Sequence, residues 1–404
     1  MKNLSLSNKV FPWYAGISRD LLFFWTIGTL FLAFVKGLEA YQIVFMFTFA
    51  NIICVILQLP ILKLIKKIGN TKSIRFGTFL MMIAAIFLTF GPNFYILIFG
   101  MTLYQLSAVF RNMENIAIKN NLKAVGREDE FIKVYSLTNT IYATATTIIA
   151  FVAGFLFNLN NYLPMYFMIA FTVLGFILSW FIFDINERKP NEQKVNNKIS
   201  IKVTPIIILI FIVYGLVFGL ISGGYTNGKL LIQFEMDSVL QTSLVASYLA
   251  FIVAVSRIAR VISNVTFNKI YNKLKDRVII LLSICLVVAF IFFIVGYFLN
   301  LDIYYRITLM ALGFLILLAI RDPMKTYIHD LTLNNTRPED HQNIFTYLAL
   351  VRKIGVSILG VIATMILTQY NLIWVIVMLL IFAVIQLIFI FKLYNQIPKG
   401  DYLK

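Results

Sequence analysis

The sequence has few of the residues that carry metal, redox or nucleophilic chemistry. It contains only two cysteines and two histidines among 404 residues. Cys54 and Cys285 both lie in apolar runs, where a lone cysteine behaves as a small core residue, so neither a disulfide framework nor a metal site is indicated. The sequence also lacks a Gly-Lys-Ser/Thr phosphate-binding loop and a Ser/His/Asp cluster. These absences argue against an enzyme, against a bound cofactor and against transport powered by ATP.

Charged residues are also scarce. They make up 13% of the chain, whereas 60% of the residues are hydrophobic and the mean hydropathy is +0.86. Both values are far from those of soluble proteins. Backbone polar groups in hydrocarbon must be satisfied internally, so a long apolar run is a helix unless it alternates like a barrel strand, and these runs do not alternate. The composition therefore predicts an all-α protein that crosses a lipid bilayer several times.

Twelve apolar runs are long enough to cross a membrane, six before and six after a polar central stretch. The predicted spans are residues 11–34, 41–62, 74–90, 94–122, 131–157, 162–183, 205–234, 240–267, 278–299, 303–333, 344–368 and 372–393. The central stretch, residues 184–202, contains Pro190 and five Lys or Arg and shows no apolar periodicity. It cannot bury enough surface to offset the entropy lost on ordering, so we interpret it as a solvated linker. The predicted organisation is a six-helix bundle at 1–183, a cytoplasmic linker at 184–202 and a second bundle at 203–404.

Lysine and arginine concentrate in alternate connections, which indicates the orientation, because basic residues in short loops are retained on the cytoplasmic side. The connections after the second, fourth and eighth spans are basic, as is the central linker, whereas the opposite connections are short and nearly free of cations. Both termini are therefore predicted to be cytoplasmic, in a multi-pass protein of the plasma membrane. The formal net charge of +17 requires no nucleic-acid partner, since contact with anionic lipid of the inner leaflet accounts for it.

The two halves also resemble each other. Arg111 and Arg321 are 210 residues apart (321 − 111), and so are Arg127 and Arg337 (337 − 127), with acidic residues following each member of the second pair. Corresponding spans would run in the same direction, which predicts a parallel repeat of the kind that many transporters contain. Chance matches among basic inner connections are the alternative explanation.

Six plus six helices, a long central linker and a basic connection between the second and third spans together resemble the major facilitator superfamily. In that family this connection carries a signature of glycines, an acid and basic residues, and takes part in the conformational change. The present chain keeps Lys67, Gly69 and Lys72 of the signature but has Leu62 in place of the first glycine and Lys66 in place of the acid. The resemblance therefore does not extend to the latch between helix ends that the acid forms in the family.

The resemblance implies a monomeric secondary transporter that moves a small solute by alternating access, with helices one, four, seven and ten lining a central cavity. The Gly-Pro motif that marks the fifth helix of many drug–proton antiporters is missing, since residues 150–154 contain no proline. A multidrug efflux pump is therefore a less favoured alternative. A lipid or glycolipid flippase on the same scaffold is a second alternative, in which a cationic cavity would accept an anionic headgroup.

Ionisable residues inside hydrocarbon are costly, so each needs a partner, a water-filled cavity or a function. Arg19 and Asp20 lie in the first span, roughly 12 Å from its start if the helix begins near Phe11. Burial at that depth favours the protonated form of a carboxyl group, which is the property that proton coupling requires. Asp20 is therefore the leading candidate for the coupling group. The alternative is a static bridge between Asp20 and an arginine that only fixes helix packing.

Two further charged pairs lie in spans that the resemblance assigns to the cavity. Arg111 and Glu114 share one face of the fourth span at i and i+3, where they could pair. Arg321 and Asp322 occupy the matching place in the tenth span, followed by Pro323, a usual device for bending a helix. The alternative is that these arginines only extend their side chains to the inner membrane boundary.

The seventh span contains the polar, glycine-rich stretch 222–229, which we interpret as a break or hinge that would bring Tyr225, Asn227 and Lys229 to the substrate. An outer loop that begins earlier is the alternative. Charges well inside the spans are mostly cationic: three acids, Asp20, Glu114 and Asp322, against eight bases, Arg19, Arg111, Arg257, Arg260, Arg321, Lys325, Arg352 and Lys353. This excess favours a substrate that carries negative charge. With Asp20 as the candidate coupling group, we expect this substrate to move together with protons.

Overall fold

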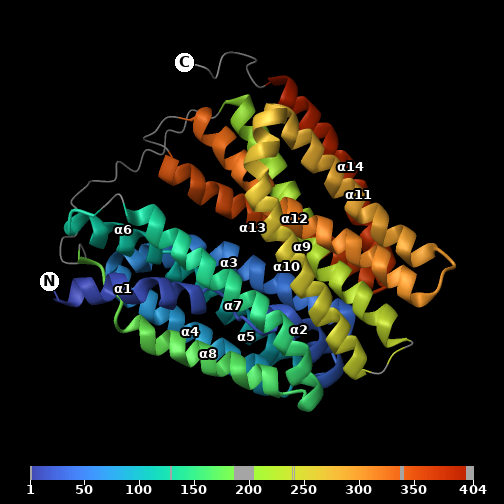
Figure 1. Ribbon diagram of the computed structural model, residues 1–404, viewed down its shortest axis with the longest axis horizontal. Coiled ribbons are helices and arrows are strands. Elements are labelled where there is room, and N and C mark those ends of the chain that lie inside the picture. The colour runs from blue at the N-terminus through green and yellow to red at the C-terminus, as the bar shows by residue number, and fades with distance from the viewer. Residues whose placement is uncertain are drawn as a thin grey trace. The chain divides into compact units, whose positions relative to one another are not determined.

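The computed structural model describes residues 2–127, 130–185, 204–238, 240, 242–336 and 341–396, and all regular structure within them is helical (Figure 1). The helices of the first half are α1 (Lys2–Ile17), α2 (Phe24–Leu30), the π-helical segment η1 (Phe31–Val35), α3 (Ala40–Ile68), α4 (Asn70–Phe90), α5 (Phe94–Arg111), α6 (Glu114–Ala124), α7 (Phe131–Leu159) and α8 (Leu163–Ser179). Those of the second half are α9 (Pro205–Asp237), α10 (Thr242–Leu274), the short 3₁₀ turn η4 (Lys275–Arg277), α11 (Val278–Phe298), α12 (Ile303–Asn334), α13 (His341–Leu367) and α14 (Leu372–Gln396).

Ten helical stretches of the described chain are long and apolar enough to cross a membrane, judged by length and composition. Two shorter apolar stretches, Phe24–Val35 and Leu163–Ser179, overlap the first and sixth predicted spans. The all-α class and the multi-pass character predicted from composition are therefore confirmed. The linker predicted at 184–202 lies outside the described residues from 186 onward.

The chain divides into two compact units. Unit 1 comprises Met1–Lys198 with Ala246–Ala254, and unit 2 comprises Ile199–Val245 with Val255–Lys404. The same neighbours recur within each: α1 packs against α7 and α8 as α9 packs against α13 and α14, and α4 packs against α5 and α8 as α11 packs against α12 and α14. This matching of neighbours supports the internal parallel repeat.

The first predicted span is not one continuous helix, which corrects the sequence interpretation. Helix α1 already begins at Lys2, ends at Ile17, and is separated from α2 by the non-helical residues 18–23 (Figure 1). Arg19 and Asp20 therefore lie in a break and not within a helix. An interrupted helix of this kind is tolerated in a membrane protein only where the freed backbone groups find partners or line a cavity. The fourth predicted span is interrupted as well, at Asn112 and Met113 between α5 and α6.

The basic connection between the second and third spans is shorter than the sequence suggested. Helix α3 continues to Ile68 and α4 begins at Asn70, so that Gly69 alone connects them, with φ of +88°. Glycine adopts this left-handed conformation without the steric penalty that a Cβ atom would bring. Lys66 and Lys67 occupy the last turn of α3, where cations are favoured by the helix dipole, and Lys72 lies in the first turn of α4.

Asp184 does not behave as the first residue of a solvated linker. It is only 4% exposed, and its carboxylate accepts hydrogen bonds from Asn70 Nδ2 at 2.7 Å and Asn120 Nδ2 at 3.0 Å. Its backbone N–H donates to Thr71 Oγ1 at 2.9 Å. The residue therefore joins the start of α4 to α6.

The break predicted at residues 222–229 is absent, since α9 is helical from Pro205 to Asp237. Its glycines allow neighbouring helices to approach closely. A Cβ atom at Gly224 would lie 2.8 Å from Leu317 Cδ1 of α12 and 2.9 Å from Phe290 Cε1 of α11. Small residues are common at such helix contacts in membranes, so glycine here indicates packing and not interruption.

Candidate functional site

Asp20 lies in the break between α1 and α2, where two tyrosines hold its carboxylate. The Tyr142 hydroxyl of α7 donates to Oδ2 at 2.7 Å, and the Tyr104 hydroxyl of α5 donates to Oδ1. Trp25 Nε1 in turn donates to the Tyr104 hydroxyl at 3.2 Å. The ion pairs formed by described residues do not include Asp20, so the static Asp20–arginine bridge is not what this structure contains.

Arg111, the last residue of α5, closes the broken end of α1. Its guanidinium donates to the backbone carbonyl of Ser18 and, at 3.5 Å, to that of Arg19. The side chain is only 5% exposed. A cation beside the carbonyls at a helix C-terminus satisfies groups that would otherwise lack partners and also complements the helix dipole. The Arg111 guanidinium therefore binds inside the protein and does not extend to its surface.

Glu114, the first residue of α6, does not pair with Arg111 as its i, i+3 spacing suggested. Its Oε1 atom instead accepts a hydrogen bond from the Tyr14 hydroxyl of α1 at 2.7 Å. That hydroxyl also lies 3.0 Å from Thr78 Oγ1 of α4. Glu114 thus connects three helices of unit 1 through one tyrosine.

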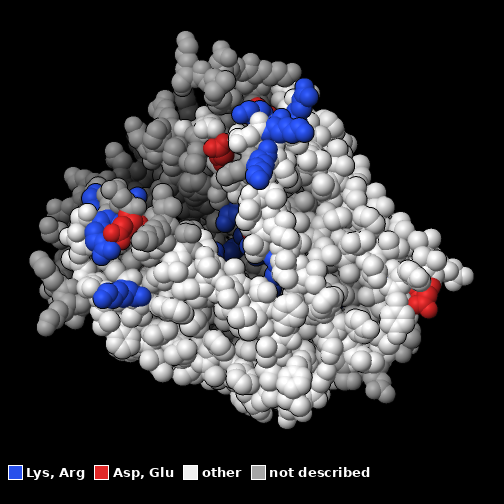
Figure 2. All heavy atoms as spheres, in the orientation of Figure 1, with Lys and Arg blue, Asp and Glu red and all other residues white. Residues whose placement is uncertain are grey.

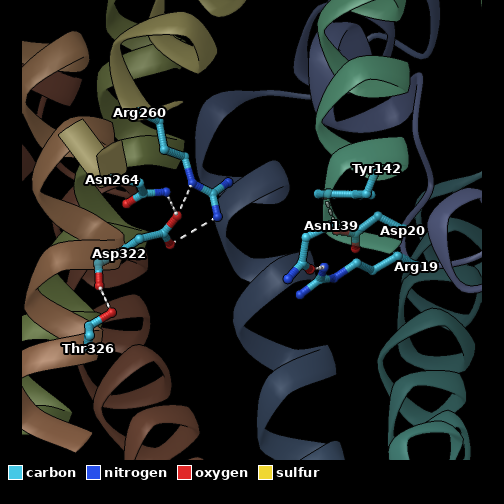
Figure 3. Close-up of polar contacts among 8 residues, drawn as sticks. All are labelled: Arg19, Asp20, Asn139, Tyr142, Arg260, Asn264, Asp322 and Thr326. Carbon is cyan, nitrogen blue, oxygen red and sulfur yellow. Dashed lines mark hydrogen bonds and ion pairs between the residues drawn. The ribbon is translucent and has the colours of Figure 1, made fainter. Parts of the chain in front are cut away.

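A cavity of about 180 Å³ lies beside these groups. It is lined by one carboxylate, two guanidinium groups, an amide, a hydroxyl and two alanines, from residues Ala15, Arg19, Ala108, Arg111, Asn112, Glu114 and Thr138. Arg19, whose side chain is exposed, donates to Asn139 Oδ1 at 2.6 Å, and its guanidinium lies 5.0 Å from the centre of the Tyr142 ring (Figure 3). Such a lining can hold a small polar solute and can exchange protons with it through a carboxyl group.

Asp322 of α12 has a different environment. Arg260 of α10 donates to both of its carboxylate oxygens, at 2.5 and 2.9 Å, and Asn264 adds a third hydrogen bond at 3.0 Å (Figure 3). Arg321 is half-buried at the preceding position. This two-point pairing fixes α10 to α12 and gives the Asp322 carboxylate a cationic partner, which the Asp20 carboxylate lacks among the described ion pairs.

The three candidates in the seventh span all lie in the continuous helix α9. Tyr225 stacks on Phe314 of α12 with ring centres 5.3 Å apart. Asn227 donates from Nδ2 to the carbonyl of Gly223 at 2.8 Å, and Lys229 is 2% exposed. Asn227 and Lys229 are therefore buried and Tyr225 is half-buried, and all three lie in a continuous helix and not in a hinge.

The structure brings Arg19, Asp20, Arg111 and Glu114 together around the break in α1. It also shows partners that sequence reasoning missed, namely Tyr14, Tyr104, Asn139 and Tyr142. Their signal was weak, because a tyrosine in an apolar span is as readily explained by packing as by the need of its hydroxyl for a partner.

A sequence profile described as Major Facilitator Superfamily matches residues 13–337. The fold is similar to the crystal structure of the nucleoside transporter NupG, with a TM-score of 0.71 and 12% identity over 97% of this chain and 99% of that one. It is also similar to a bacterial homologue of the iron transporter ferroportin in its inward-facing state, with a TM-score of 0.70 and 11% identity over 96% and 98% of the two chains. No curated protein sequence matches the chain. The sequence match, with the multi-pass fold, shows that this chain belongs to the major facilitator superfamily and points to a transporter of small molecules and not an enzyme.

Proposed function

We propose that the chain is a secondary active transporter that moves a small, partly anionic solute by alternating access and couples this movement to protons through Asp20. The observation that carries the proposal is the interrupted first helix, which presents Asp20 to two tyrosine hydroxyls beside a polar cavity. Interrupted helices form the binding sites of many transporters, because their freed backbone groups and end dipoles interact with substrates and coupling ions. This fold serves different substrates, since one similar structure is a nucleoside transporter and another is a homologue of an iron transporter.

Transport by purified protein in liposomes tests this proposal. Labelled small organic anions are expected to accumulate when a pH gradient is imposed, and accumulation should collapse when an ionophore removes the gradient. Translocation of fluorescent lipid between leaflets, without accumulation of any solute, would instead favour the flippase. Accumulation of cationic drugs alone would favour the efflux pump.

The proposal includes twelve spans in a monomer of the plasma membrane, with both termini cytoplasmic. The ten long apolar stretches of the described chain, together with the two shorter ones, support this number. Figure 2 shows basic side chains clustered where α10 ends and α11 begins, where Lys269, Lys273, Lys275 and Arg277 are exposed. Basic residues in such a connection favour the cytoplasmic side.

Cysteine labelling in intact cells checks this topology. A cysteine at Asn160, which is exposed between α7 and α8, is expected to react with an impermeant reagent, and one at Asn191 is expected to be protected. Both variants should react after the cells are permeabilised, which controls for folding and expression. Reaction at position 191 with protection at 160 would reverse the proposed orientation.

Substitution of Arg321 tests the negative charge of the substrate. Arginine can bind a carboxylate or phosphate through two hydrogen bonds, whereas lysine offers a single point of contact. Arg321→Lys is therefore expected to weaken binding of a transported anion by roughly tenfold, or about 1.4 kcal/mol, while the protein still folds. Calorimetric titration with the transported anion measures this, and wild-type affinity would argue that Arg321 does not contact the substrate.

A further inference from the structure

Gln233 of α9 is buried in an unusual way. Its side chain is 0% exposed, and neither its Oε1 nor its Nε2 atom has a hydrogen-bond partner among the described residues. Burying an amide without partners costs free energy, because both ends lose their hydrogen bonds to water. In a folded protein such a group indicates strain, an unseen partner or a ligand site.

A comparison within unit 2 shows that complete burial of a glutamine does not by itself leave both ends of its amide without hydrogen-bond partners. Gln386 of α14 is the same residue type and is also 0% exposed, yet its Nε2 atom donates to Ser283 Oγ of α11 at 3.1 Å. Gln233 has no such contact at either end of its amide. The fold therefore provides a partner for one end of the Gln386 amide, whose Oε1 atom has none among the described residues, and for neither end of the Gln233 amide.

The neighbours of Gln233 on α9 carry charge and an aromatic surface. Tyr225, Lys229 and Gln233 follow one another at intervals of four residues, so they lie along one face of the helix. Lys229 is 2% exposed, and Arg257 of α10 is close enough to act on it electrostatically. Tyr225 stacks on Phe314 at the other end of this row. The row thus combines a cation, an amide with both donor and acceptor, and an aromatic pair.

We propose that Lys229 and Gln233 form a binding subsite for the anionic group of the transported solute. The amino group of Lys229, with Arg257 close enough to act on it electrostatically, attracts the anion, and the Gln233 NH₂ group donates hydrogen bonds to carboxylate or phosphate oxygens. The Gln233 carbonyl oxygen accepts from a hydroxyl or amino group next to the anion, so the substrate class is a small organic anion with a hydrogen-bond donor beside its charge. The subsite rests on the proposed transport function, because the buried row must open during the transport cycle to admit the solute.

Charged thiol reagents test whether the row opens and whether it is electropositive. In protein whose Cys54 and Cys285 are replaced by alanine, Gln233→Cys is expected to react with the anionic sulfonatoethyl methanethiosulfonate about fivefold or more faster than with the cationic trimethylammonioethyl reagent. Adding Lys229→Gln should reduce this preference. Gln386→Cys, equally buried, is the matched control and is expected to stay unmodified. A Gln233→Cys variant as unreactive as Gln386→Cys, or one with no charge preference, overturns the proposal.

Thermal unfolding of two leucine variants provides a second measurement if a cysteine variant does not fold. Gln233→Leu removes an amide that has no partner, so its melting temperature is expected to equal or exceed that of the wild type. Gln386→Leu removes a hydrogen bond and should lower it. An equal loss in both variants means that Gln233 has a structural partner, and the proposal fails. Transport in liposomes with an unreactive Gln233→Cys would contradict the subsite alone, whereas charge-selective labelling without solute transport would contradict the proposed function.

Discussion

Replacement of Asp20 by asparagine is expected to reduce proton-driven accumulation to the level of empty liposomes. The amide cannot bind and release a proton, so the pH gradient has no group on which to act. Asparagine has nearly the same size as aspartate, and its amide can still form hydrogen bonds with Tyr104 and Tyr142, the two residues that hold the carboxylate. The fold, and with it the exchange of labelled for unlabelled solute across the membrane, should therefore be retained.

The matched control for this experiment is Asp322→Asn, which removes a carboxylate that Arg260 holds within a predicted span. Asp322 accepts two hydrogen bonds from Arg260, so its loss is expected to lower thermal stability while the folded protein still couples uptake to protons. Uptake and exchange are measured on the same liposome preparations. Unaltered pH-driven uptake by well-folded Asp20→Asn protein would end the assignment of Asp20 as the coupling group.

Substitution of Arg111 is expected to have the largest effect on stability. Arg111→Ala removes the charged donor from the carbonyls of Ser18 and Arg19 and leaves the buried Ser18 carbonyl without it, which should lower the free energy of unfolding by about 2–3 kcal/mol. Arg111→Lys can restore one of the two contacts, so it should lose roughly half as much. Unfolding of the purified protein in detergent, followed by circular dichroism against temperature, measures both.

Arg19→Lys is the control for the Arg111 variants. Arg19 belongs to the same break but is exposed, and lysine keeps its charge, so its replacement is expected to change stability by less than about 1 kcal/mol. If Arg111→Lys were as stable as the wild type, the guanidinium would not be needed to close the broken helix. Its role would then lie in substrate binding alone, which the affinity of the same variant would show.

The sequence by itself determined the class of protein and the residues that need an explanation. Apolar runs in which backbone groups must be satisfied internally could only be helices, so the all-α multi-pass fold followed from composition. A charged side chain within such a run is costly in hydrocarbon, whatever tertiary fold the chain adopts. For this reason Asp20, Arg111 and Glu114 were identifiable as site candidates before any contact was known.

Only the tertiary structure decided how those residues are used. The break in α1 is stabilised by Arg111, which is 93 residues away from Ser18 in the chain, and no local pattern reports such a contact. Asp184 looked solvated in a polar stretch, yet it is buried because Asn70 and Asn120 converge on its carboxylate.

Helix α9 shows the opposite case, in which a local signal was outweighed. Its polar, glycine-rich residues 222–229 suggested a break, but glycine at position 224 allows α11 and α12 to approach, and the helix continues to Asp237. A glycine within a helix costs about 1 kcal/mol of helix stability relative to alanine. The packing of neighbouring helices contributes more than this, and so does the need to satisfy every backbone group in hydrocarbon. Where a membrane helix breaks is therefore set by which distant side chains can satisfy the freed backbone groups, and that information exists only in the folded chain.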